Sequence, residues 1–169
     1  LSLSKIEMNA AVLPSGAVAV GDLLHTVAES LSLQAERDDQ KIVIDSTENL
    51  RVRGDADELT QVFWNLIENA LKYGRESGKV SINVQPAEDD QSIRIAVSDD
   101  GEGIEEEHLD RLTERFYRVD KGRSRAMGGT GLGLAIVKHI VARHRGTLEI
   151  ASTVGHGSTF SVILPAHKS

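Results

Sequence analysis

The sequence predicts an α+β domain in which helices pack against a sheet as an α/β sandwich. Segments with the residue pattern of strands occur in adjacent pairs, at 41–45 and 50–54, at 79–85 and 92–99, and at 147–152 and 158–164. Longer segments with apolar residues at helical spacing separate these pairs. Strands that come in groups beside helices, instead of alternating with them one by one, are typical of a sandwich rather than of a parallel βαβ sheet.

Two helical segments precede the first strands. Residues 1–8 resemble the end of an amphipathic helix that stops before Pro14 and Gly16. Residues 18–37 are predicted to form a second helix. Its apolar side chains recur at helical spacing, at Val20, Leu23, Leu24, Val27, Leu31 and Ala35.

The clearest helix covers residues 56–73. Its apolar residues follow the i, i+3, i+4 rhythm, at Leu59, Val62, Phe63, Leu66, Ile67, Ala70 and Leu71. We expect Asp55 to be the N-cap and Glu58 to complete a capping box with it. Gly74 is expected to end the helix in the left-handed conformation.

A long loop follows the strand at 92–99. Residues 105–127 contain a short helical hint and then many Lys, Arg and Ser residues, and a loop of this length is usually functional or mobile. The last helix is expected to run from Gly131 to about Arg145 and to end at Gly146. Arg143 and Arg145 then lie where the helix dipole favours cations.

The composition is that of one ordinary globular domain. The 169 residues are 40% hydrophobic and 27% charged. A net charge of −7 argues against a general nucleic-acid binder. The absence of cysteine excludes disulfides, thiolate metal sites and cysteine nucleophiles. No apolar run reaches the roughly 18 residues that a membrane-spanning helix needs.

The predicted helix at 56–73 has a polar edge beside its apolar stripe. Asn65, Asn69 and Lys72 lie there at i, i+4 and i+7. A carboxamide oxygen can complete a Mg²⁺ shell without adding charge, and a lysine can meet a phosphate. The alternative is a solvated polar flank without a ligand.

Three further clusters are candidates for ligand contact. DDGEGI at 99–104 ends a strand, and its glycines permit close approach of a ligand to the backbone. A carboxylate there could accept a hydrogen bond from an exocyclic amine. The alternative is a tight turn without a ligand. GGTGLG at 128–133 leads into a helix, whose unpaired N–H groups can bind an anion, although it is neither a Walker A loop nor a framed dinucleotide motif. RFYR at 115–118 could cover a purine, dock a partner or pin the loop.

Taken in order, these motifs resemble the catalytic ATP-binding domain of bacterial sensor histidine kinases, which has the Bergerat fold of gyrase, Hsp90 and MutL. NLIENALKY (65–73) is similar to the N box, DDGEGI to the first glycine box, RFYR to the F box and GGTGLGL (128–134) to the second glycine box. GHGSTFSVILP (155–165) is similar to the last strand, so that the resemblance covers about residues 16–165. It implies a two-layer sandwich with a mixed, mostly antiparallel sheet on about three helices, and a flexible ATP lid at about 105–128.

The resemblance also implies which residues bind ATP and Mg²⁺. Asp99 would bind the adenine amino group, with Gly103 positioning the base, and Asn69 would be the Mg²⁺ ligand. Thr159 is expected on a strand that faces the base. The full expected binding set is Asn65, Asn69, Lys72, Tyr73, Asp99, Gly101, Gly103, Ile104, Phe116, Arg118, Gly129, Thr130, Gly131, Leu132, Gly133 and Thr159.

By the same resemblance, Asn65, Lys72 and Tyr73 would surround the phosphates and the ribose. Arg118 and the N–H groups of residues 130–133 would hold the phosphate tail. Asn65, Lys72 and Arg118 are then the expected catalytic residues. Catalysis would rest on positioning and charge stabilisation, with Mg²⁺ neutralising the β and γ oxygens.

One position separates kinases from ATPases in this superfamily. The ATPases carry a water-activating Glu four residues before the Mg²⁺-binding Asn, and here that residue is Asn65. Glu68 precedes Asn69 directly and so lies about 100° away around the helix. The resemblance therefore implies slow ATP hydrolysis, with the γ-phosphoryl group kept for an acceptor histidine.

The acceptor itself is not expected in this chain, because none of its histidines has the neighbours of the family's H box. Residues 1–14 resemble the tail of the dimerisation and phosphoacceptor hairpin, and residues 15–169 the catalytic domain. We therefore expect a protein-histidine kinase domain that does not phosphorylate itself. Arg145 departs from the family's His-Gly-Gly pattern, with little expected consequence.

The expected partners are the kinase's own dimerisation domain and a response regulator, within a homodimeric parent anchored in the inner membrane. The chain itself would be a cytoplasmic part with no contact to nucleic acid or membrane. Residues 118–141 are most similar to kinases of the phosphate-sensing class. There are two alternatives. One is a stand-alone ATPase of the gyrase or Hsp90 type, and the other is a degenerate module that binds nucleotide or a partner.

Overall fold

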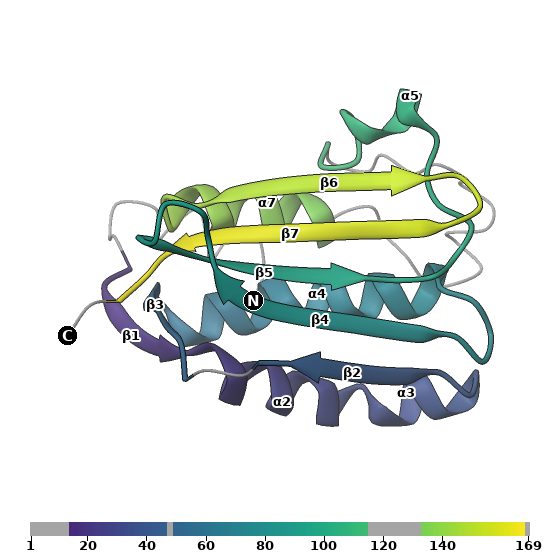
Figure 1. The fold of residues 1–169 in the computed structure, drawn as a ribbon, viewed down its shortest axis with the longest axis horizontal. Coiled ribbons are helices and arrows are strands. Elements are labelled where there is room, and N and C mark those ends of the chain that lie inside the picture. The colour runs from purple at the N-terminus through teal and green to yellow at the C-terminus, as the bar shows by residue number, and fades with distance from the viewer. Residues whose placement is uncertain (1–13, 47–48, 115–132, 168–169) are drawn as a thin grey trace.

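The computed structural model describes residues 14–46, 49–114 and 133–167 of the chain. Its helices and strands lie close to the predicted segments (Figure 1). In chain order they are β1 (Gly16–Ala19), α2 (Val20–Ser30), α3 (Ser32–Arg37), β2 (Lys41–Asp45), β3 (Arg51–Gly54), α4 (Ala56–Tyr73), β4 (Lys79–Pro86), β5 (Ser92–Ser98), α5 (Glu106–Leu109), α7 (Gly133–Arg143), β6 (Thr147–Thr153) and β7 (Gly157–Pro165).

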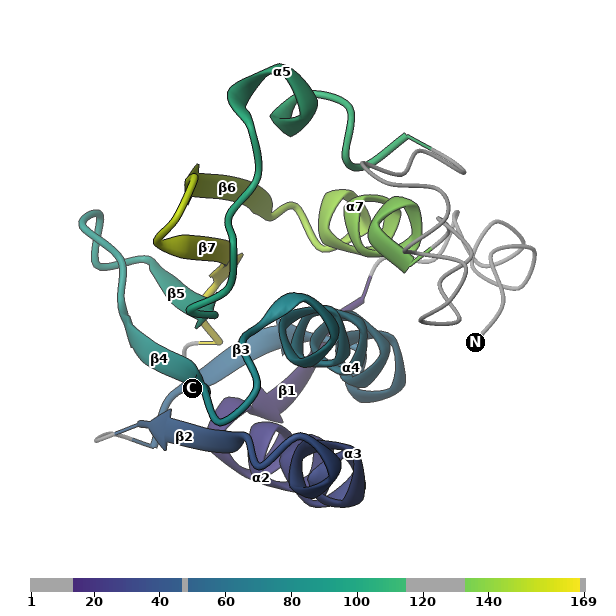
Figure 2. The ribbon, with the colours of Figure 1, turned by 90° about the vertical axis from the view of Figure 1, so that its right-hand side faces the viewer.

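The fold is a two-layer sandwich, as predicted. A five-stranded sheet has the order β2-β4-β5-β7-β6, in which only β2 and β4 are parallel. Figure 2 shows α2, α3, α4 and α7 together on one face of this sheet. The other face of the sheet carries no helix among the described residues.

Helix α4 is the centre of the core. Its apolar stripe, from Leu59 to Leu71, is almost entirely buried, and Phe63 is among the largest fully buried side chains. The strands beneath it bury every second residue, as Ile93, Ile95 and Val97 do in β5. Burial of an apolar side chain of this size contributes about 1.5–3 kcal/mol, so this stripe fixes the helix on the sheet.

The first helix differs from the prediction. Residues 16–19 form strand β1, which pairs with β3 so that Val18 lies opposite Val52 in a small second sheet. The predicted single helix is broken at Leu31 into α2 and α3. The hydroxyls of Ser30 and Ser32 donate to backbone carbonyls of the preceding turn there, and such bonds compete with the helix ladder.

The expected left-handed cap at Gly74 is wrong. Gly74 has φ −73° and ψ 171°, which is extended backbone. The end of α4 is capped instead by Gln40, whose Nε2 donates to Leu71 O at 3.0 Å and to Arg75 O at 3.2 Å. A Cβ on residue 74 would lie 2.7 Å from Ala70 O and 3.1 Å from this Nε2. Glycine is therefore required here for space and not for its conformation.

The last helix ends slightly earlier than predicted: α7 ends at Arg143, and Arg145 beyond it takes the left-handed conformation. Arg145 has φ 58°, and its N–H donates to Ala142 O while the N–H of Gly146 donates to Val141 O. These two bonds form a Schellman motif, whose left-handed position usually holds glycine. Gly146 has a different role, since a Cβ there would lie 2.5 Å from Ile163 O.

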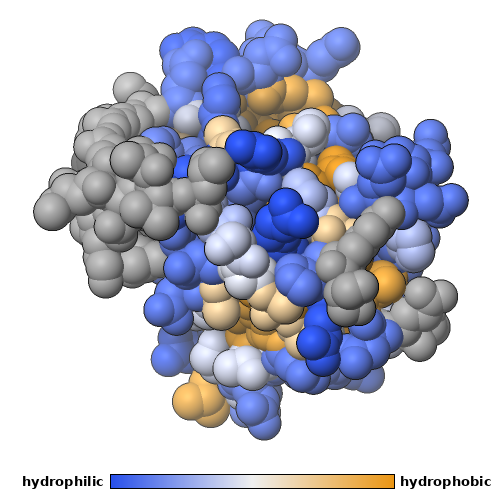
Figure 3. All heavy atoms as spheres, turned by 90° about the vertical axis from the view of Figure 1, so that its left-hand side faces the viewer, coloured by the Kyte–Doolittle hydropathy of each residue, from blue (hydrophilic) through white to orange (hydrophobic). Residues whose placement is uncertain are grey.

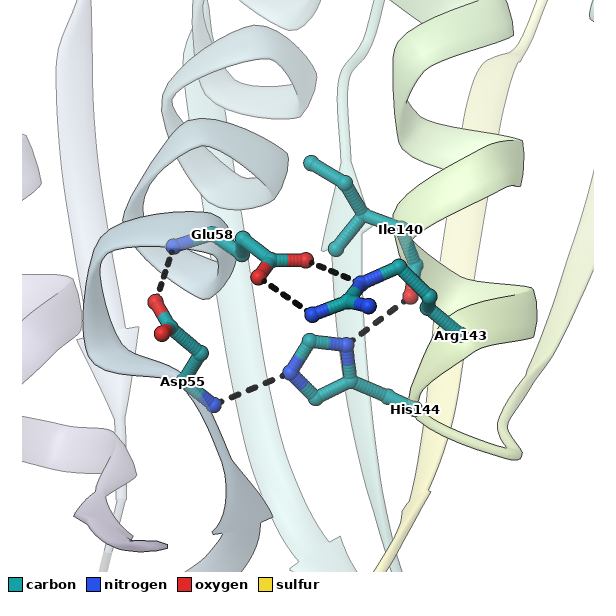
Figure 4. Close-up of polar contacts among 5 residues, drawn as sticks. All are labelled: Asp55, Glu58, Ile140, Arg143 and His144. Atoms are coloured by element: carbon teal, nitrogen blue, oxygen red, sulfur yellow. Dashed lines mark hydrogen bonds and ion pairs between the residues drawn. The ribbon is translucent and has the colours of Figure 1, made fainter. Parts of the chain in front are cut away.

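The N-terminus of α4 is joined to the C-terminus of α7 by a buried polar network (Figure 4). Asp55 is the N-cap as predicted, because its side chain accepts from the N–H of Glu58 at 2.9 Å. The expected capping box is incomplete, since both oxygens of Glu58 bind Arg143 at 2.8 Å. The Asp55 N–H donates instead to His144 Nε2 at 3.0 Å, and His144 Nδ1 lies 2.9 Å from Ile140 O. We call these side chains of residues 55, 58, 143 and 144 the helix lock.

The surface is mixed in character. Figure 3 shows a mostly hydrophilic end of the domain, with apolar side chains exposed in separate patches between polar ones. Scattered apolar exposure of this kind is ordinary for globular domains. Within the part of the chain that the structure describes, no helix is both long and apolar enough to cross a membrane.

Replacing Arg145 with glycine should stabilise the domain by about 1 kcal/mol, because a left-handed conformation is unfavourable for residues with a Cβ. Chemical denaturation of the wild type and of Arg145→Gly measures the difference. Gly146→Ala is the matched variant on the next residue, and it should be destabilising because its Cβ meets backbone. An Arg145→Gly variant less stable than the wild type would contradict the assignment.

Stability should also depend on the protonation of His144. Burial lowers the pKa of this imidazole below its ordinary value of 6.5, and the unprotonated Nε2 is needed to accept the Asp55 N–H. As pH falls below the ordinary value, the unfolded chain takes up the proton before the folded one. The contribution of His144 is therefore complete above about pH 6.5 and is lost below it.

Denaturant midpoints at about pH 5.5 and about pH 7.5 test this expectation. The wild type should lose more stability on acidification than His144→Gln, in which no imidazole is buried. His156→Gln, at an exposed position, is the control and should behave as the wild type does. Equal pH dependence of the wild type and His144→Gln would refute the role of His144.

Candidate functional site

Helix α4 presents the expected polar edge beside its buried stripe. Asn65, Asn69 and Lys72 are all half-buried on this edge. The Asn65 amide donates to Gln61 O at 3.0 Å, and Lys72 Nζ pairs with Glu68 Oε1 at 3.2 Å. The edge therefore offers carboxamide oxygens and one cation, with a carboxylate already beside the cation.

The start of α7 lies against this edge. A Cβ on Gly133 would be 3.2 Å from Asn65 Oδ1, so the two helices are in close contact at this point. The first N–H groups of a helix have no partner within it, and they carry the positive end of its dipole. The N-terminus of α7 therefore adds positive potential next to the polar edge of α4.

Asp99 forms the second part of the site, directly after β5. Its Oδ1 accepts the N–H of Gly101 at 2.9 Å, and its own N–H donates to Ser158 O at 2.9 Å. Burial raises the pKa of the Asp99 carboxyl, while the bond from Gly101 opposes this rise. A carboxylate in such a place can accept a hydrogen bond from an amine in surroundings where that bond is strong.

Glycines bring Asp99 next to the end of α4. A Cβ on Gly101 would collide with the backbone carbonyl of Tyr73, and one on Gly157 with the carbonyl of Asp99 itself. Gly103 has φ 80° and packs against the carbonyl of Thr153. The glycines of this segment are thus required by contacts within the chain, in addition to any approach of a ligand.

Ile104 is held at the same junction. Its N–H donates to Ser152 Oγ at 2.7 Å, and this hydroxyl lies 2.8 Å from Ser158 Oγ. The segment that follows Asp99 is therefore fixed to β6 and β7 through serine side chains.

Thr159 is not brought together with these residues, which corrects the expectation that it faces the base. Its hydroxyl lies 2.9 Å from Ser98 Oγ, on the helix-free face of the sheet. Side chains alternate along a strand, so the neighbouring Ser158 points toward the helices and is buried. Asp99 follows Ser98 and lies on that inner side, where its Cβ is close to Gly74.

Several expected site residues lie outside the described residues, namely Phe116, Arg118, Gly129, Thr130, Gly131 and Leu132. Of the expected lid, the structure describes residues 105–114, in which α5 is the short helix that the sequence hinted at. Leu112 is buried, so this first part of the lid is packed on the domain.

Two residues at the site have no role in the sequence analysis. Gln40 holds the last turn of α4 from a position 31 residues from Leu71, and no local pattern marks such a contact. Asp100 Oδ2 accepts the N–H of Lys79 at 3.0 Å, with Gly78 packed against the carboxylate. The pair of acidic residues before Gly101 is visible in the sequence. The sequence does not tell which of the two carboxylates binds Gly101 and which binds Lys79.

The site thus has two ends with different chemistry. The Asp99 end offers a half-buried acceptor for a hydrogen-bond donor, and the α4–α7 end offers carboxamides, a lysine and a helix N-terminus. The second set suits a polyphosphate with its cation, because neutral oxygens can ligate the metal while positive groups meet the phosphates. Tyr73 and Gly101, in contact with each other, join the two ends.

Comparison with known proteins gives a consistent result. Residues 54–168 match the family model described as "Histidine kinase-, DNA gyrase B-, and HSP90-like ATPase". The chain is 41% identical over 161 residues to the phosphate regulon sensor protein PhoR of Pseudomonas aeruginosa, covering 95% of this chain and 36% of that protein. It is 46% identical over 143 residues to the sensor-like histidine kinase SenX3 of Mycobacterium tuberculosis, covering 83% of this chain and 34% of SenX3.

Solved structures share the fold. Full-length ShkA in complex with AMPPNP has a TM-score of 0.82 and 27% identity, over 98% of this chain and 34% of the ShkA chain. The mycobacterial sensor histidine kinase MprB has a TM-score of 0.78 at 24% identity, covering 92% of this chain and 99% of the solved MprB chain, and supports the fold alone. The chain spans about a third of the length of the PhoR and SenX3 proteins that it matches.

Proposed function

This chain belongs to the histidine kinase-, DNA gyrase B- and HSP90-like ATPase family, as a catalytic domain of the sensor histidine kinase type, and we propose that it transfers the γ-phosphoryl group of ATP to a histidine on a separate dimerisation domain. The observation that carries the proposal is the junction of Tyr73 with Gly101. It sets the half-buried Asp99 carboxylate beside the polar edge of α4. One nucleotide can then reach both, with its base at one end and its phosphates at the other.

At the base end, Asp99 accepts the exocyclic amine of adenine. The bond from Gly101 orients the carboxylate, and burial makes the charged acceptor strong in this place. Gly103 and Ile104, fixed to β6, form the backbone beside the base.

At the phosphate end, Asn69 is the proposed Mg²⁺ ligand, and its neutral carboxamide fits that cation. Mg²⁺ would neutralise charge on the β and γ oxygens. Asn65, Lys72 and Tyr73 surround the phosphates and the ribose, and Gly133 begins the helix whose N-terminus attracts the phosphate charge.

Further residues of the proposed site lie outside the described part of the chain and are expected to complete the phosphate end. Phe116 and Arg118, with the N–H groups of residues 129–132, remain expected contacts of the nucleotide. Arg118 would stabilise the charge that develops on the transferred group.

Two side chains favour transfer over hydrolysis. Asn65, at the position of the ATPase base, cannot take a proton from water, and its amide is already bonded to Gln61 O. Glu68 is the nearby carboxylate of the same helix, but it pairs with Lys72. A stand-alone ATPase of the gyrase or Hsp90 type is therefore the less suitable function.

The wider setting follows from the relatives. The proposed parent is a homodimeric membrane-anchored sensor in which residues 1–14 end the dimerisation hairpin and residues 15–169 form the catalytic domain, with residues 105–128 as the lid. A response regulator would receive the phosphoryl group from the hairpin histidine. The name of the Pseudomonas relative supports the phosphate-sensing class for this chain also.

Asp99→Asn should weaken ATP binding about 10- to 150-fold, which corresponds to the loss of a hydrogen bond to a charged group. The fold should be retained, because an amide oxygen can still accept the Gly101 N–H. Titration calorimetry measures the affinity, and Asp45→Asn, at an exposed position of β2, is the matched control. Unchanged affinity in Asp99→Asn would remove this residue from the base site.

The chain alone should bind ATP with Mg²⁺ and remain unlabelled by radioactive γ-phosphate, since it lacks the acceptor. It should label a separately supplied dimerisation hairpin of its own kinase. A hairpin with the acceptor histidine replaced by glutamine is the control and should stay unlabelled. Label on the chain alone, or none on the intact hairpin, would contradict the proposed transfer.

A further inference from the structure

We propose that the helix lock is a positioning device for the phosphate end of the nucleotide, an inference that rests on the proposed function. Glu58 and Arg143 lie at the far ends of α4 and α7 from the proposed phosphate contacts. Their side chains bind each other at the opposite end of α7 from its contact with Asn65. Their effect would pass along the two helices to the contact between Gly133 and Asn65.

The two helices meet at both ends of their contact. At one end Gly133 lies against Asn65, and at the other Arg143 and His144 lie against the first turn of α4. The helices therefore run antiparallel. A shift of α7 along its axis by the rise of one residue would displace Gly133 by about 1.5 Å relative to Asn65.

The lock resists such a shift. The Glu58–Arg143 pair has two bonds of 2.8 Å, and each side chain is only 8% exposed. A guanidinium that binds both oxygens of a carboxylate accepts a narrow range of positions and angles. His144 adds a second tie, because its ring bonds the backbone of Asp55 on α4 and lies against Ile140 O on α7.

Apolar contacts between α4 and α7 restrict the relative position of these helices less than the Glu58–Arg143 pair does. Hydrophobic packing is non-directional, and cores tolerate repacking when volume is kept. Buried ion pairs often add little net stability over apolar residues of the same size. The low directionality of apolar packing and the small net stability of buried ion pairs lead to the same view. The main effect of the helix lock is to fix the relative position of α4 and α7, rather than to stabilise the fold.

The base end is held by contacts that do not involve α7. Gly101 packs on Tyr73, Gly157 packs on Asp99, and Gln40 caps the end of α4. Loosening the lock should therefore affect the phosphates and spare the adenine. This separation distinguishes a positioning role from a general loss of structure.

The experiment compares ATP·Mg²⁺ with adenosine as ligands of the same protein. In the double variant Glu58→Leu, Arg143→Met, apolar side chains replace the buried pair, and the protein should fold with a denaturation midpoint near that of the wild type. Its affinity for ATP·Mg²⁺ should fall about tenfold or more, while its affinity for adenosine stays within about twofold.

Arg143→Lys is a second variant that keeps the positive charge and loses the two-bond geometry. It should lower ATP affinity without changing adenosine affinity, and it tests the proposal even if the double variant does not fold. The matched control is Glu149→Gln, which breaks the pair between Glu149 and Arg94 at 2.9 Å on the helix-free face. That variant should bind both ligands as the wild type does.

Two results would overturn the lock. One is that both affinities, for ATP·Mg²⁺ and for adenosine, stay at the wild-type values in the folded double variant or in Arg143→Lys. The other is that both affinities fall by the same factor. A wild-type chain that binds neither ligand would overturn the proposed function and the lock with it. Wild-type binding of both ligands with no change in the variants would overturn the lock alone.

Discussion

The buried pair of Glu58 and Arg143 imposes a constraint that reaches through the helical layer. Two charges withdrawn from water tend to remain bonded to each other, since breaking a buried ion pair by separating its partners is strongly destabilising. Helices α4 and α7 must therefore approach each other at their outer ends. The apolar stripe of α4 fixes that helix on the sheet. The ion pair with α4 then determines where α7 lies.

The opposite end of α4 is organised by backbone contact instead of charge. Carbonyls of Tyr73, Thr153 and Asp99 lie where a side chain on a facing glycine would have to be. Close backbone approach leaves little free volume, so Asp99 is half-buried, and this burial raises the pKa of its carboxyl. Chemistry at this end is thus a consequence of how three chain segments are packed.

Sequence reasoning recovered what local periodicity encodes. Helix α4 begins and ends at the predicted residues, because its apolar rhythm and its Asp55 cap are both local signals. Strand β1 was missed because the helical spacing that begins at Val20 gives no information about residues 16–19. The strand that pairs with these residues is more than thirty residues away in the sequence. Gln40 was missed for the same reason.

In the site, helical spacing predicted the polar edge of α4, but the sequence did not predict the orientation of Thr159 on its strand or the partner of Glu58 at the helix start. Thr159 was assigned to the base, and one step along the strand places it on the other face of the sheet. A period of two makes such an assignment sensitive to a single position. Glu58 was expected to bond its own helix end, and a guanidinium 85 residues away took the carboxylate instead.

The helix-free face of the sheet has a practical consequence. Asn83 is exposed there on β4, on the opposite face of the sheet from the helices. The chain contains no cysteine. A single cysteine introduced at this position would be the sole thiol available to a maleimide dye, and the domain could be immobilised or tracked in solution through its helix-free face.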